Sequence, residues 1–141
     1  GYDDGAVSMP TKPDDAAELY RQSRPDALAV SIGNVHLQTS AKTVINRPAL
    51  AEIEKVVNCP LVLHGASGIR AEDRHWLASQ TNVCKLNVGT ELRQTFGLEL
   101  RNVLAKNRDL FDCNLIMQAV KPALVEKTKT ILASLYRQKE K

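Results

Sequence analysis

The sequence predicts an α/β fold, and within that class the C-terminal part, about strands six to eight, of a (β/α)8 or TIM barrel followed by C-terminal helices. Helical patterns alternate with short apolar runs, as in a series of βαβ units. These runs are mainly apolar, which is typical of parallel strands buried on both faces. The 141 residues hold three such runs, whereas a complete barrel takes roughly 250 residues. A doubly wound sheet is the competing architecture, but its G-x-G-x-x-G signature is absent.

The first half of the chain alternates two helices with two strands. An acidic first turn predicts a helix that has Thr11 as its cap and ends near Pro25. The continuous apolar run 27–32 predicts a fully buried strand. A helical pattern at 48–58 starts at a proline and stops before the short apolar strand at 61–63.

The second half contains one more strand between helices. Residues 71–79 are predicted to form a helix, and His75 in its middle is assigned to the surface. A third strand is predicted at 83–88. Apolar residues in helical register predict a long amphipathic helix at 91–105, and a final helix is predicted at about 115–136.

Composition and charge exclude several classes of protein. The chain is 43% hydrophobic and 25% charged, with a net charge of +3, so neither a nucleic-acid partner nor a membrane surface is indicated. Cys59, Cys84 and Cys113 lie far apart without CxxC spacing, which predicts reduced thiols and a cytoplasmic protein, and the first two are expected to be buried. No signal peptide or spanning stretch is evident. Because the chain starts at Gly1 rather than at a methionine, we expect a piece of a longer protein.

Candidate metal ligands follow two neighbouring strands. His36 lies after the first strand, His64 directly after the second and residues 87–90 at the end of the third, so parallel strands would bring all three groups to one rim. Two imidazoles suit Zn²⁺, whose catalytic sites take three protein ligands and keep one open position. The third ligand would come from strands outside these residues. The alternative, that these are ordinary core or surface histidines, stays open.

Small and hydroxyl-bearing residues follow the second and third strands. Gly65, Ser67 and Gly68, then Gly89 and Thr90, offer backbone amides and two hydroxyls. Barrel enzymes frequently bind phosphate with the loops after strands seven and eight, at the N-terminus of a helix. A phosphate site is therefore one interpretation. The other is that Thr90 is an ordinary helix N-cap and that the glycines are turn residues.

Three stretches, 27–36, 61–69 and 84–92, resemble successive signatures of the class II, zinc-dependent ketose-bisphosphate aldolases, which include fructose- and tagatose-bisphosphate aldolases. The resemblance extends from Gly1 to about Ser134 and matches the second half of the family. It implies that residues 1–141 are the C-terminal half of a single barrel domain.

The resemblance implies roles for individual residues. His36 and His64 would be two of three zinc ligands. Asp3 would stand at the end of a mobile loop, residues 1–10, where the family has a glutamate thought to move a proton. The residues that would hold the phosphate and hydroxyls of dihydroxyacetone phosphate are Gly65, Ala66, Ser67, Asn87, Val88, Gly89 and Thr90.

The activity implied for the whole protein is reversible, zinc-dependent cleavage of a ketose 1,6-bisphosphate, fructose or tagatose, to dihydroxyacetone phosphate and glyceraldehyde 3-phosphate. The resemblance also implies a monovalent cation, a dimeric or tetrameric homo-oligomer and an N-terminal barrel half. Residues 1–141 alone are expected to be inactive. Leu37 stands where the family usually has a glycine near substrate or cation. Two alternatives remain, a non-catalytic or regulatory relative that keeps the phosphate pocket, and a barrel lyase for another phosphorylated sugar.

Overall fold

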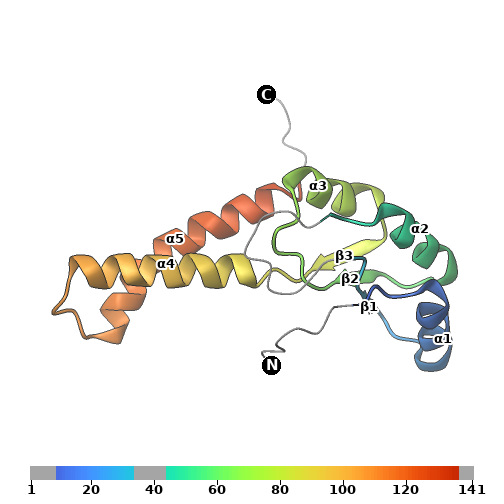
Figure 1. Ribbon diagram of the computed structural model, residues 1–141, viewed down its shortest axis with the longest axis horizontal. Coiled ribbons are helices and arrows are strands. Elements are labelled where there is room, and N and C mark those ends of the chain that lie inside the picture. The colour runs from blue at the N-terminus through green and yellow to red at the C-terminus, as the bar shows by residue number, and fades with distance from the viewer. Residues whose placement is uncertain (1–8, 34–43, 137–141) are drawn as a thin grey trace.

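The computed structural model describes residues 9–33 and 44–136, and it contains the predicted alternation of helices and strands (Figure 1). The elements in chain order are α1 (Pro13–Ser23), β1 (Leu28–Val30), α2 (Arg47–Val56), β2 (Leu61–Leu63), α3 (Ala71–Gln80), β3 (Val83–Leu86), α4 (Thr90–Lys106) and α5 (Cys113–Ala133). Strand β2 has the predicted bounds, while β1 and β3 are shorter than predicted, and both C-terminal helices begin within about two residues of their predicted starts.

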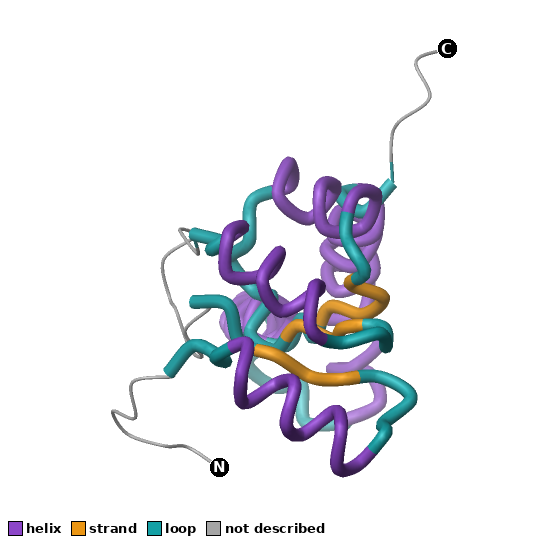
Figure 2. The backbone as a smooth tube through the Cα atoms, turned by 90° about the vertical axis from the view of Figure 1, so that its right-hand side faces the viewer, coloured by secondary structure: helices purple, strands orange, loops and turns teal. Residues whose placement is uncertain are grey.

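The three strands form a parallel sheet in the order β1-β2-β3. Figure 2 shows them side by side. Helix α2 connects β1 to β2 and α3 connects β2 to β3, so each connection is a βαβ crossover. Leu63 is paired with Val30 on one side and with Leu86 on the other, which brings the carboxyl ends of the three strands to one edge.

The core lies between the sheet and the helices that form an arc around its outside in Figure 1. Leu61 and Leu63 of β2 are fully buried, as are Leu50 and Ile53 of α2 and Leu77 of α3. Burial of each such side chain contributes about 1.5–3 kcal/mol. The core therefore fixes the strands whose ends carry the candidate site.

The opposite face of the sheet is open among the described residues. Ala29 of β1 and Lys85 of β3, which both pair with Val62 of β2, are exposed, and Val62 itself is half-buried. The expectation that the strands are buried on both faces is thus wrong for this part of the chain, because the helices cover one face only. Cys84 is exposed rather than buried, whereas Cys59 is buried as predicted.

All three cysteines are free, in agreement with the prediction of reduced thiols. In the part of the chain that the structure describes, no helix has the length and apolar character needed to cross a membrane.

Thr11 does not cap α1. The N-cap is Lys12, and no side chain caps this helix. Thr11 instead pairs with Ser31, with a 2.8 Å bond from the Thr11 N–H to the Ser31 carbonyl and a 2.9 Å bond from the Ser31 N–H to the Thr11 hydroxyl. The hydroxyl is therefore used to attach the segment before α1 to the end of β1.

Helix α3 carries buried charges that its sequence did not indicate. Asp73 is 2% exposed and accepts hydrogen bonds from Arg47 at 2.8 Å and Arg70 at 3.0 Å. Burial raises the pKa of the Asp73 carboxyl, but the two arginines outweigh it and hold this pKa below its ordinary value. The guanidinium of Arg47 also lies 4.3 Å from the ring centre of Trp76. These contacts fix α3 against α2.

His75 is half-buried, so its assignment to the surface is wrong. Its Nδ1 atom is buried without a hydrogen-bond partner among the described residues. The sequence prediction failed because the polar neighbours of His75 suggested an exposed face, whereas Asp73 and Arg74 are themselves buried.

Helices α4 and α5 pack against each other as a long hairpin that projects from the sheet (Figure 1). The hairpin begins at the end of β3, so its first turn lies at the same edge as the other strand ends.

Candidate functional site

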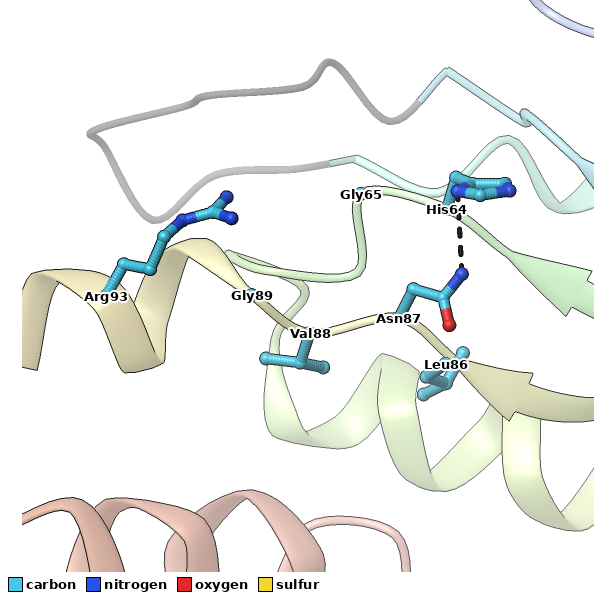
Figure 3. Close-up of a pocket in the computed structure, with 7 residues that line it drawn as sticks. All are labelled: His64, Gly65, Leu86, Asn87, Val88, Gly89 and Arg93. Atoms are coloured by element: carbon cyan, nitrogen blue, oxygen red, sulfur yellow. Dashed lines mark hydrogen bonds between the residues drawn. The ribbon is translucent and has the colours of Figure 1, made fainter. Parts of the chain in front are cut away.

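His64 and Asn87 meet at the carboxyl edge of the sheet. Each directly follows a paired strand residue, Leu63 in β2 and Leu86 in β3. Asn87 Nδ2 lies 3.4 Å from His64 Nδ1, and Figure 3 shows the two side chains pointing toward each other. The His64 side chain is exposed. The prediction that parallel strands bring these two loops together is confirmed.

The turn after β2 has a backbone that favours glycine. Gly65 and Gly68 have φ values of 61° and 83°, in the left-handed region where a Cβ atom is strained. Between them, Ala66 is fully buried. Its N–H donates to the Asn87 carbonyl at 3.2 Å, and the Asn87 N–H donates to the Leu63 carbonyl at 2.9 Å. These bonds attach the turn to the end of β3.

Helix α4 begins at the site with an N-cap residue that has no side chain, and its Glu91 N–H donates to the Ser67 hydroxyl at 3.4 Å. Gly89 is the N-cap residue, so the alternative that Thr90 is the N-cap is wrong. The Thr90 hydroxyl instead accepts a 3.4 Å contact from Arg93. Helix N-termini carry backbone N–H groups without intrahelical acceptors and a partial positive charge, both of which favour an anion.

These residues surround an open pocket of about 500 Å³. Figure 3 shows that the guanidinium of Arg93 extends from α4 toward Gly65. The pocket is lined by His64, Gly65, Leu86, Asn87, Val88, Gly89 and Arg93. Five of these are predicted site residues. Val88 additionally packs against the hydrophobic core.

Arg93 is a site residue that sequence reasoning missed. It lies one helical turn after Gly89, and its N–H donates to the Gly89 carbonyl at 3.0 Å. The sequence signal that could have identified Arg93 is a cationic residue one turn into a helix that starts at a glycine just after a strand. The pocket thus combines an imidazole, an amide and a guanidinium, of which the last can pair with a phosphate or carboxylate.

An ion cluster lies behind the turn. Arg74 of α3 donates to Glu91 of α4 and, at 3.1 Å, to the Ala66 carbonyl. Glu91 also pairs with Lys127 of α5 at 3.0 Å and accepts a 2.9 Å bond from the Gly68 N–H. Burial raises the pKa of the Glu91 carboxyl, but the Gly68 hydrogen bond and the two cations outweigh it, so this pKa lies below its ordinary value.

The described residues supply one of the two predicted zinc ligands. His36 and Asp3 lie outside these residues, as do the loop start at 1–8 and Leu37. Over 9–33 and 44–136, no group of three or more His, Cys, Asp or Glu could hold a metal ion. An exposed imidazole at a strand end fits the donor chemistry of zinc, so His64 is suited to bind it together with ligands from elsewhere.

A family model for class II fructose-bisphosphate aldolase matches residues 1–140. The chain belongs to the class II fructose-bisphosphate aldolase family. Family membership confirms the resemblance found in the sequence, which depended on the strand ends described above.

Solved structures of aldolases share the fold of this chain. The YdjI aldolase from Escherichia coli K12 is 30% identical, with a TM-score of 0.67 over 89% of this chain and 44% of that one. A fructose-bisphosphate aldolase from Campylobacter jejuni superposes with a TM-score of 0.70 over 90% of this chain and 45% of that one, at 21% identity. This chain therefore spans less than half the length of either.

Proposed function

We infer that the whole protein to which this chain belongs catalyses reversible, zinc-dependent aldol cleavage of a ketose 1,6-bisphosphate, fructose or tagatose, to dihydroxyacetone phosphate and glyceraldehyde 3-phosphate. One observation carries the proposal. His64 and Asn87 meet at adjacent parallel strand ends, beside a glycine turn and the start of α4, in a chain of the class II aldolase family.

The fold supports a place within a larger barrel. Three parallel strands in sequential order, with helices on one face and an open face opposite, are what about strands six to eight of a (β/α)8 barrel would present. Ala29 and Lys85 would then face the barrel interior. The proposed domain is the C-terminal half of this barrel, residues 1–141, with 1–10 as the end of a mobile loop.

Zinc would be held by His64, His36 and a ligand from the other barrel half. When bound, the ion supplies Lewis-acid polarisation of the substrate carbonyl. Asn87 lies 3.4 Å from the His64 ring and can restrain its orientation by hydrogen bonding. Asp3 is proposed to move a proton, and a monovalent cation near Leu37 is part of the same proposal.

The phosphate of the substrate would bind between the turn at 65–68 and the start of α4. The Ser67 and Thr90 hydroxyls, the backbone at Gly65, Val88 and Gly89, and the α4 N-terminus would supply donors and positive potential. Arg93 adds a full positive charge on the pocket wall. Fixing the phosphate in this way would hold the reacting carbons beside the metal and reduce the entropic cost of reaching the transition state.

The test is release of triose phosphate from fructose and tagatose 1,6-bisphosphates by the whole protein, before and after removal of metal by a chelator. Cleavage of either sugar, lost on chelation and restored by Zn²⁺, is the expected result. Bound zinc with no cleavage of either sugar would overturn it. In that case, turnover of another sugar phosphate would indicate a different lyase, and phosphate binding without turnover a non-catalytic relative.

The remaining proposals concern the setting of the protein. We place it in the cytoplasm as a homo-oligomer, without nucleic-acid or membrane partners. The family and the free thiols are consistent with such a setting.

A further inference from the structure

The turn at 65–68 is held by two side chains from different helices. Arg74 of α3 donates to the Ala66 carbonyl at 3.1 Å, and Glu91 of α4 accepts from the Gly68 N–H at 2.9 Å. Arg74 and Glu91 also pair with each other. Each of these two side chains thus contacts both the turn and the other side chain. Together with the backbone of the turn, they form a closed ring of hydrogen bonds.

Both members of this pair are withdrawn from solvent. The side chains of Arg74 and Glu91 are 6% and 17% exposed. The Nε atom of Arg74 is buried with no partner among the described residues. A buried arginine with an unsatisfied donor is costly, so its presence here indicates a role other than stability alone.

The cluster also has an excess of positive charge. Lys127 of α5 reaches Glu91 Oε2 at 3.0 Å, so two cations surround one carboxylate behind the turn. Because the desolvated surroundings weaken screening, this net charge favours an anion on the other side of the turn.

We propose that Arg74 and Glu91 are positioning residues that fix the 65–68 turn in its phosphate-binding shape, a role that rests on the proposed function. Glu91 engages the Gly68 amide, and Asn87 engages the Ala66 amide. The amides of Ala66 and Gly68 are therefore used to hold the turn in place. The phosphate takes its hydrogen bonds instead from Ser67 and from the start of α4.

The test compares Glu91→Gln and Arg74→Gln with Asp73→Asn in the whole protein. Asp73 is a matched control because it is a buried carboxylate on α3 whose hydrogen bonds run to Arg47 and Arg70. Three quantities are measured: hydrogen exchange of the Gly68 amide, inhibition of cleavage by inorganic phosphate, and KM with kcat.

Glu91→Gln and Arg74→Gln are expected to accelerate Gly68 exchange and to raise the inhibition constant for phosphate and the KM, each about tenfold. The change in kcat is smaller, and bound zinc is unchanged. Asp73→Asn lowers the melting temperature but leaves all of these constants near wild type. Should Arg74→Gln fail to fold, Glu91→Ala, which removes the acceptor of the Gly68 N–H, decides the matter.

Two results would overturn the inference. Unchanged Gly68 exchange in Arg74→Gln, or in Glu91→Ala, which has no acceptor for the Gly68 N–H, would show that the pair does not fix the turn. Faster exchange with unchanged phosphate inhibition would show that the turn is held but does not bind phosphate. Absence of phosphate inhibition in the wild-type protein would instead contradict the proposed phosphate site, and the exchange data would still report whether the pair restrains the turn.

Discussion

Glu91 accepts a 2.9 Å hydrogen bond from the backbone amide of Gly68, so the turn after β2 and the first turn of α4 form one structural unit. The two segments are separated by the whole of α3 and β3 in sequence. Arg74, between them on α3, completes the unit by pairing with Glu91. The candidate phosphate site is therefore built from the turn after β2 together with side chains of α3 and α4.

The depressed pKa of Glu91 predicts that part of the stability is lost in acid. A carboxyl whose pKa is lower in the folded state than its ordinary value of 4.5 stabilises the protein above that pH. This contribution disappears as pH falls through the folded-state pKa. We expect the free energy of unfolding, measured by urea titration between about pH 7 and about pH 3, to fall less steeply in Glu91→Gln than in wild type.

The control for this measurement is Glu18→Gln. Glu18 lies on α1 in an exposed pair with Arg21, so its replacement should leave the acid slope near wild type. If the free energy of unfolding falls equally steeply with pH in wild type and in Glu91→Gln, the assignment of Glu91 as a carboxylate stabilised by folding is contradicted.

Gly68→Ala is expected to destabilise the protein by about 1–2 kcal/mol, because an alanine would have to adopt a φ of 83°. Gly97→Ala is the matched control. Gly97 lies inside α4, and a Cβ there meets the flexible end of Arg101 at 3.5 Å, so this change should stabilise by about 0.5–1 kcal/mol. Chemical denaturation measures both. Equal effects at the two glycines would contradict the left-handed conformation of the turn.

Leu77→Ala tests the core that supports the site. Leu77 is fully buried on α3, and its truncation should cost about 2–5 kcal/mol in the free energy of unfolding. Leu98 on α4 is 56% exposed, so Leu98→Ala should change the stability by less than about 1 kcal/mol. If both variants unfold at the same denaturant concentration, the assignment of Leu77 to the hydrophobic core is wrong.

The element order and the strand ends could be predicted because they depend on local signals. Short, mainly apolar runs identified the strands, and the abrupt change after Leu63 to a histidine and a glycine marked the edge of the sheet where the candidate site lies. Since parallel strands end at one edge, the meeting of His64 with Asn87 follows from the topology alone.

The parts that could not be predicted depend on tertiary partners. Thr11 has the side chain of a helix cap but hydrogen-bonds to Ser31, twenty residues away. Arg74 and Asp73 look like solvent-facing helix residues, and only the positions of Glu91 and Arg47 in space explain their burial. Which face of a strand is covered likewise depends on where the helices pack, so the exposure of Cys84 was not evident from the local sequence.

The central claim is that the strand end at His64 holds a catalytic metal beside a phosphate turn. It is tested most directly by measuring bound zinc per chain and the rate of ketose-bisphosphate cleavage in the whole protein for wild type, His64→Ala and His75→Gln. We expect one zinc and full activity in wild type and in His75→Gln, whose imidazole lies on α3 away from the pocket. His64→Ala is expected to lose zinc at limiting metal concentration and at least about 100-fold in rate. Full zinc occupancy and an undiminished rate in His64→Ala would contradict the account.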